Sequence, residues 1–242
     1  MRHPLTLLVA MLALAAGCAK PEMPVGPVVI PRASSAPVID GRLDDACWKD
    51  AIVLKGFSLA LSDRWPSKAT TARLVFDDGT LYVAVECAEL DPSKLRTNVT
   101  VENDAVWSDD SVQVFVRTGD DFTSYDQFMI NPAGARGWNF PRAAGEDDRV
   151  PRFEAFAAVT PRSWAAEFAI PWTDLGLSGA PDGRAIELKI GRYDASSTPV
   201  QPDVWPPKAR FSGPEDFAVV HLGAPGAGPG RRARSRRARG GA

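Results

Sequence analysis

Two amide side chains and a methionine in the middle of the sequence could together line a ligand-binding surface. Gln113 alternates with valines in the segment 111–117, and Met129 and Asn131 alternate with apolar residues in the segment 127–131. Successive side chains of a β-strand point to opposite faces of a sheet, so these three would share a face turned away from the core. Such a face could bind a ligand, and ordinary solvated strand polarity is the competing interpretation of Gln113 and Asn131.

The sequence offers little that could catalyse a reaction. His221 is the one histidine left if His3 leaves with the N-terminal leader described below, and it alternates with Phe217 and Val219, which predicts a packed side chain. Any two of the thirty acidic residues could pair for glycoside hydrolysis, and nothing in the sequence marks such a pair. No phosphate-binding glycine loop, zinc spacing or nucleophile elbow is present. We therefore expect a protein that is not an enzyme.

Short alternating segments must position these side chains. No segment after Val38 keeps a helical period over three turns, and turn residues recur every eight to twelve positions, as in Asp77–Thr80 and Thr160–Ser163. This pattern predicts an all-β, antiparallel β-sandwich of jelly-roll type, in which two sheets pack over one apolar core. The expected strands are 71–76, 81–87, 111–117, 127–131, 153–159, 164–170, 186–190 and 217–221.

The tryptophans divide into two groups by their surroundings. One group sits at apolar positions of the strand pattern or beside them, where packing in the core is expected. The other falls in Pro- or Gly-rich segments, where an indole could rim a groove. The first group is Trp48, Trp164 and Trp172; the second is Trp65, Trp138 and Trp205.

The N-terminal segment reads as a leader for export. Residues 1–17 carry Arg2 and then an unbroken apolar run that is too short to span a bilayer. The run ends in Leu-Ala-Ala-Gly-Cys and resembles a bacterial lipobox, although leucine stands four places before Cys18 instead of three. Cys18 is then the expected site of diacylation and membrane anchoring; ordinary cleavage with a free thiol is the alternative.

We expect one domain between two extended ends. Residues 18–37 are rich in Pro, Ala and Ser and predict a lipidated tether, residues 38–222 form the domain, and residues 223–242 form a disordered tail with six arginines. The whole chain has a formal charge of −2, so the part outside the tail is acidic. An exported acidic domain makes nucleic acid a poor partner. We expect a monomer in the cell envelope, anchored in the outer membrane, or periplasmic or secreted if Cys18 is not acylated.

Two further cysteines remain in the domain. Cys47 lies beside Trp48, and Cys87 ends an alternating segment. An oxidising compartment would permit a disulfide between them, but two buried free thiols fit the sequence as well.

Four motifs together resemble the family 9 carbohydrate-binding modules and their relatives in the DOMON-like superfamily. In order along the chain they are VIDGRLDDACW at 38–48, WSDDSVQVF at 107–115, WAAEFAIPW at 164–172 and PEDF at 214–217. They span nearly the whole domain. The resemblance implies a β-sandwich and non-catalytic carbohydrate binding with no required cofactor.

The resemblance also implies a set of site residues. In this family two aromatic side chains hold a sugar while polar residues of neighbouring strands bind its hydroxyls; the aromatic positions fall on Trp107 and Phe211 here. The polar positions fall on Gln113, where the sugar binder has Glu, on Asn131, and on Met129, where it has Arg. A pyranose has apolar C–H faces and a polar equator, so an indole with amides at its rim suits it.

Calcium is a lesser possibility that the same family suggests. Its members hold structural calcium through loop oxygens, and Asp91, Asp109 and Asp110 offer such ligands, although no spaced calcium motif is present. Solvated loop carboxylates are the competing interpretation.

Two other functions stay open at this stage. Related DOMON-type domains bind haem b through methionine and either histidine or lysine, so Met129 with His221 or a lysine forms an alternative electron-transfer site. The sandwich could also serve only as a scaffold for protein contacts at the cell surface.

Overall fold

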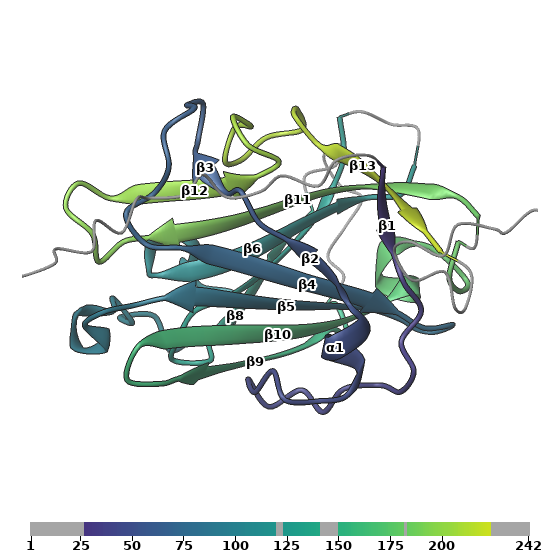
Figure 1. Cartoon of the computed structure of the whole chain (residues 1–242), viewed down its shortest axis with the longest axis horizontal. Coiled ribbons are helices and arrows are strands. Elements are labelled where there is room, and N and C mark those ends of the chain that lie inside the picture. The colour runs from purple at the N-terminus through teal and green to yellow at the C-terminus, as the bar shows by residue number, and fades with distance from the viewer. Residues whose placement is uncertain (1–26, 120–122, 141–149, 182, 224–242) are drawn as a thin grey trace, which may run out of the picture.

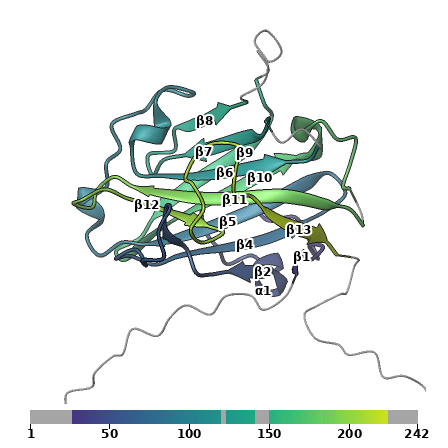
Figure 2. The same cartoon turned by 90° about the horizontal axis from the view of Figure 1, so that it is seen from above.

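The protein is an all-β sandwich of two packed sheets (Figure 1). The computed structural model describes residues 27–119, 123–140, 150–181 and 183–223. Within these residues, no helix is both long and apolar enough to cross a bilayer. Turned by 90°, the molecule shows its two layers, with β7 and β8 on one side and β2, β4 and α1 on the other (Figure 2).

The larger sheet has eight strands in the part of the chain that the structure describes. Its order is β1-β13-β11-β6-β7-β8, with β12 also pairing with β11, and β3 with β12. All pairs are antiparallel except β1 with β13, which is parallel. The strands are β1 (Val28–Ile30), β3 (Ser58–Leu59), β6 (Ser111–Arg117), β7 (Asp126–Ile130), β8 (Arg136–Asn139), β11 (Ala185–Asp194), β12 (Gln201–Trp205) and β13 (Ala218–Leu222).

The smaller sheet has five described strands in the order β2-β4-β5-β10-β9. The described residues also form one short α-helix and three 3₁₀ turns. The strands are β2 (Ile52–Leu54), β4 (Thr70–Phe76), β5 (Thr80–Ala88), β9 (Glu154–Val159) and β10 (Ser163–Pro171). The helical elements are α1 (Cys47–Asp50), η1 (Pro92–Lys94), η2 (Val106–Ser108) and η3 (Trp172–Leu175).

The core forms where the inner faces of the two sheets meet. Val112 and Val114 of β6 and Phe128 of β7 point inward from the larger sheet and are fully buried with Val83 and Phe168 of the smaller one. Period-two alternation puts every second residue of each strand on this face, so burial of these side chains fixes the register of the strands.

A segment before α1 covers the outer face of the smaller sheet. Glu167 of β10 is fully buried there, and its carboxylate accepts hydrogen bonds from the backbone of Asp40 and Gly41 and from Nε1 of Trp48. Burial raises the pKa of Glu167 to about 6. Gly41 has a φ of +80°, and a Cβ there would come within 2.6 Å of the Ala158 nitrogen, so only glycine fits.

The expected strands are present, and the structure corrects three other expectations about the domain. β1 lies within the predicted tether, where Ile30 is fully buried and accepts a hydrogen bond from the Gly223 backbone. His221 is exposed, because Val220 and Leu222 are the residues of β13 that face the core. Trp138 and Trp205 are not in loops but in β8 and β12, and the indole of Trp205 lies in the core.

The cysteines of the domain are both buried and free. Cys87 lies in the core between the sheets, whereas Cys47 packs with Trp48 and Tyr82 on the far side of the smaller sheet. Burial raises the pKa of the Cys87 thiol to about 12 and that of Cys47 to about 11, so neither is a reactive thiolate near neutral pH.

Some predictions fall on segments outside the described residues. These are the leader 1–17, Cys18, the first part of the tether and nearly all of the arginine-rich tail.

Candidate functional site

A hollow of about 890 Å³ lies on the outer face of the larger sheet. We call it the site hollow. This volume is within the range of small-molecule binding sites. Strands β6, β7, β8 and β11 supply its floor, and the loops that carry η2 and residues 211–213 supply its walls. Its lining residues are Asn103, Asp104, Ala105, Trp107, Gln113, Tyr125, Gln127, Met129, Trp138, Asn139, Tyr193, Phe211, Ser212 and Gly213.

Side-chain amides form a connected row across the floor. Gln127 Nε2 donates to Gln113 Oε1 at 2.7 Å, and Gln113 Nε2 donates to Ser111 Oγ at 3.1 Å. At the β8 side, Asn139 Nδ2 lies 3.4 Å from Gln127 Oε1, which accepts its hydrogen bond. Each amide carries two N–H donors and an acceptor oxygen, so the row fixes its members and still has capacity for a ligand. We call Gln113, Gln127 and Asn139 the amide row.

Trp107 is presented to solvent by a short, anchored turn. Its side chain is 59% exposed, whereas Val106 beside it is fully buried against Met129 and Ala135. Ser108 Oγ closes the turn by donating to the Ala105 carbonyl at 2.7 Å. The indole is thus accessible at the wall of the site hollow, where a flat apolar ligand face could stack on it.

Phe211 is held against the sheet from three sides. Its ring makes edge contacts with Phe115, at 6.3 Å between centroids, and with Tyr193, at 5.8 Å. Gly191 lies beneath, and a Cβ there would come within 2.6 Å of the Phe211 ring. Glycine at this position of β11 therefore lets the ring rest on the backbone.

Lys189 ties the Phe211 loop to the sheet without entering the hollow. Its Nζ donates to the carbonyl oxygens of Gly213 and Glu215, at 2.9 and 3.1 Å, and lies over the rings of Phe115 and Phe217. Burial lowers the pKa of Lys189 to about 8.

The lining is almost uncharged. Asp104 is the one ionisable carboxylate among the described lining residues, which include no histidine, lysine or arginine. Glycoside hydrolysis needs two carboxyl groups across the bond that breaks. Two aromatic walls over an amide row instead suit a neutral ligand with apolar faces and a polar edge.

Residues 39–211 match the model of the family described as carbohydrate family 9 binding domain-like. The chain belongs to this family. Carbohydrate-binding modules of this kind are non-catalytic, so membership agrees with the absence of paired acids in the described lining and supports non-catalytic carbohydrate binding as the function of the sandwich.

Solved structures share the fold of this family 9-like domain at low sequence identity. One is described as a carbohydrate-binding protein of Bacteroides uniformis, with a TM-score of 0.65 and 15% identity over 81% of this chain and 97% of that one. A family 9 module of Caldicellulosiruptor kristjanssonii in complex with cellotriose has a TM-score of 0.59 and 18% identity, covering 81% and 92% of the two chains. The same module in complex with glucose gives the same score and identity. A search of curated proteins found no match.

The structure brings four of the five predicted ligand-binding residues together. Trp107, Gln113, Met129 and Phe211 all line the site hollow. Asn131 does not: it is fully buried beyond the end of β7, where Nδ2 donates to the Val99 carbonyl at 2.8 Å and to Asp109 at 3.0 Å. Its Oδ1 accepts from the backbone of the turn that follows. The role of Asn131 is thus to hold loops that flank the hollow.

The three predicted calcium ligands do not converge. Asp109 accepts a hydrogen bond from the Val99 backbone at 2.8 Å, Asp110 accepts one from the Arg96 backbone at 2.8 Å, and Asp91 pairs with its neighbour Lys94. Within the described residues, no group of three or more histidine, cysteine or acidic side chains is arranged to hold a metal ion. The hydrogen bonds of Asp109 and Asp110 instead stabilise the loop that leads to Trp107.

The alternative haem site lacks a second axial ligand among the described residues that line the site hollow. Met129 does lie in the site hollow, but His221 is exposed on β13, and neither it nor a lysine is among the described lining residues. Met129 Sδ also accepts a hydrogen bond from Gln127 Nε2 at 3.5 Å.

Sequence reasoning missed several lining residues. Gln127 lies on the same face of β7 as Met129, so alternation alone could have identified it. Tyr193 shares the face of Gly191 on β11, but the predicted strand ended at residue 190. Asn139 lies in β8, which the pattern did not predict, and Tyr125 comes just before β7, where no periodic signal applies.

Proposed function

We propose that the site hollow binds a saccharide, with a pyranose ring of the glucose type against Trp107 and Phe211 and its hydroxyls on the amide row. The observation that carries this proposal is an exposed indole in the same hollow as a fixed second ring, above linked side-chain amides. Family membership and the neighbours solved with glucose and cellotriose support it.

The lining favours a neutral sugar with equatorial hydroxyl groups. Such a ring has apolar C–H faces that stack on aromatic side chains, while its hydroxyls lie in the ring plane and reach amides at the edge. No cation lines the described part of the hollow, so a uronic acid or a phosphorylated sugar would lack a charge partner.

Calorimetric titration of the full chain with cellotriose and glucose tests the proposal. Trp107→Ala removes an aromatic contact from one wall of the site, and we expect it to cost about 1–3 kcal/mol of binding free energy without lowering the unfolding midpoint. Phe156→Ala is the matched control, because Phe156 is a 50%-exposed aromatic on β9 of the other sheet. Full affinity in Trp107→Ala, or an equal loss in Phe156→Ala, would refute the assignment.

We also propose that the domain is exported as a monomer and anchored through acylation of Cys18. The support is the apolar run of residues 1–17 and the small residues before Cys18. Labelled palmitate is expected to enter the wild-type precursor and not the Cys18→Ala variant, which should leave the membrane fraction. A variant that stays in that fraction would contradict the anchor.

A further inference from the structure

A second hollow of about 430 Å³ lies at the far side of β12. Its most prominent side chain is Trp65, which is 39% exposed and belongs to no part of the site hollow. Prolines at 199 and 202 add apolar surface, and Ser62, Arg64 and Gln201 add polar groups. An exposed indole beside hydrogen-bonding side chains is a feature that this hollow shares with the site hollow.

One strand pair of the larger sheet links the two hollows. Tyr193 lines the site hollow, and its register partner on β12, Pro202, lines the second hollow. Ala60, also in the second hollow, donates its backbone N–H to the Pro202 carbonyl at 2.9 Å. Tyr193 and Ala60 are therefore two strand spacings apart, about 10 Å. A short oligosaccharide spans this distance, whereas a single sugar does not.

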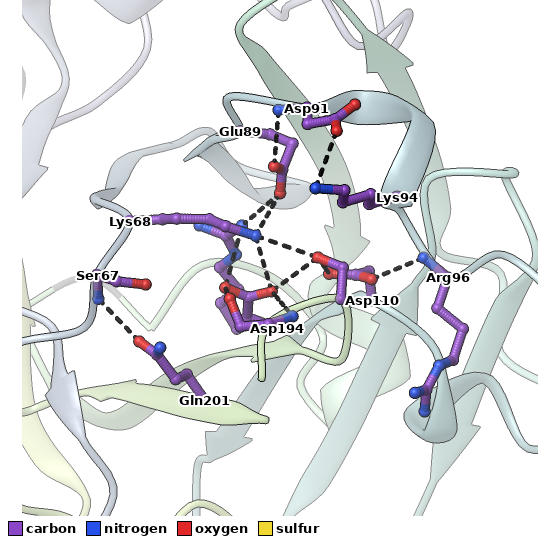
Figure 3. A network of polar contacts seen from close by, with 12 residues as sticks. Ser67, Lys68, Glu89, Asp91, Lys94, Arg96, Asp110, Asp194 and Gln201 are labelled. Carbon is purple, nitrogen blue, oxygen red and sulfur yellow. Dashed lines mark hydrogen bonds and ion pairs between the residues drawn. The ribbon is translucent and has the colours of Figure 1, made fainter. Parts of the chain in front are cut away.

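The loop that carries Trp65 is held in place. Leu59 donates its backbone N–H to the Arg64 carbonyl at 2.8 Å, which closes the loop. On the other side of Trp65, the Ser67 backbone donates to Gln201 Oε1 at 2.8 Å (Figure 3). Because the loop is ordered before a ligand arrives, little conformational entropy is lost on binding.

A buried ion network fixes Lys68, the residue that follows Ser67. Figure 3 shows the Lys68 amino group between the carboxylates of Glu89 and Asp194, to which its Nζ lies at 2.6 and 3.1 Å. Both carboxylates are almost fully buried, as is Arg192 nearby. The network therefore holds the base of the Trp65 loop rigidly against the sheet.

We infer that the second hollow is a further subsite, in which Trp65 contacts additional units of the saccharide held at Trp107. The inference rests on the proposed function and extends it, since it makes the ligand of this domain an oligosaccharide chain. The Tyr193–Pro202 strand pair is the point where the chain crosses from one hollow to the other.

Binding of glucose and cellohexaose to the full chain tests the inference. Trp65→Ala is expected to lower the affinity for cellohexaose about five- to thirtyfold and to leave that for glucose unchanged. Trp65→Phe should retain most of the affinity. Leu61→Ala is the control, because Leu61 is a 70%-exposed apolar residue of the same loop that does not line the second hollow.

The outcomes separate the inference from the proposed function. If Trp65→Ala binds both ligands as the wild type does while Trp107→Ala loses both, the subsite is wrong and the primary site stands. An equal loss of glucose binding in Trp65→Ala would also overturn the subsite, because it would indicate a general structural effect. If the wild type binds neither ligand, or Trp107→Ala binds both fully, the proposed function fails and the subsite fails with it.

Discussion

Gly191 decides where the Phe211 ring can lie. Any larger residue would place its Cβ within 2.6 Å of the ring, so the outer wall of the site hollow depends on a residue that contributes no side chain. Trp107 differs, since its backbone is anchored by Val106 while its indole remains in solvent. One wall is thus fixed and the other is free to settle on a ligand.

Buried carboxylates set the response of the domain to pH. Burial raises the pKa of Asp203 to about 7 and that of Asp110 to about 6, although the charge of Arg192 opposes the shift in each. Asp203 Oδ2 accepts a hydrogen bond from Thr70 Oγ1 at 2.7 Å, while Oδ1 finds no donor among the described residues. Asp203 therefore keeps its proton in the folded state at pH values where the unfolded chain has lost it.

The direction in which stability changes with pH follows from this difference in bound protons between the folded and unfolded states. The folded state binds more protons than the unfolded chain between about pH 4 and pH 7, so the free energy of unfolding should fall as the pH rises through that window. Asp203→Asn removes the titrating group but can still accept from Thr70. We expect this variant to show a flatter dependence, most clearly between pH 6 and 7, in urea unfolding. A stability that rises with pH over this interval in the wild type would contradict the assignment.

At the scale of elements, alternation predicted the strands whose pairing is local. β4 with β5 and β9 with β10 are hairpins with clear turn residues, so the sequence contains both strands and their connection. β1, β2, β3, β8 and β12 were missed for physical reasons. Each is only two to five residues long, and β8 and β12 contain Gly137 and Pro202, residues that weaken a strand pattern.

β13 shows how alternation can be read in the wrong phase. Val219 and His221 alternate with Val220 and Leu222, and both sets include apolar residues. Val220 and Leu222 face the core because of the register in which β13 pairs with β1 and β11. These partners are distant in the sequence, so the local pattern of β13 does not reveal that register. The prediction that Asn131 lines the site was wrong for a similar reason. β7 ends at Ile130, so alternation no longer applies, and the Asn131 amide is hydrogen-bonded to the loop that follows.

Removal of β1 tests the corrected start of the domain. A chain that begins at Val38 lacks Ile30. It also lacks the backbone hydrogen bonds that β1 and the residues after it form with Phe76 and Gly223. We expect it to lose at least about 2 kcal/mol of unfolding free energy relative to a chain that begins at residue 27, measured by denaturant unfolding. Equal midpoints for the two chains would show that β1 adds nothing to the domain.

At the scale of the whole molecule, the sandwich keeps its apolar core between the sheets and leaves one outer face for binding. The four motifs of the sequence indicated this fold, and the resemblance they carry indicated four of the residues that line the site hollow. Of the other lining residues, some lie on strands that were missed or predicted too short, and others lie on loops 103–105 and 212–213 that meet the sheet only in the folded molecule. The second hollow beyond β12 extends the same face.

Saccharide contact with Trp107 is tested most directly by nuclear magnetic resonance of the nitrogen-15-labelled protein. The indole N–H signal of Trp107 can be assigned by its loss in Trp107→Phe and followed during titration with cellotriose. We expect this signal to shift in a saturable way while the signals of Trp164 and Trp172, which are fully buried, stay in place. A Trp107 signal that does not move while cellotriose perturbs another surface would contradict the proposed site.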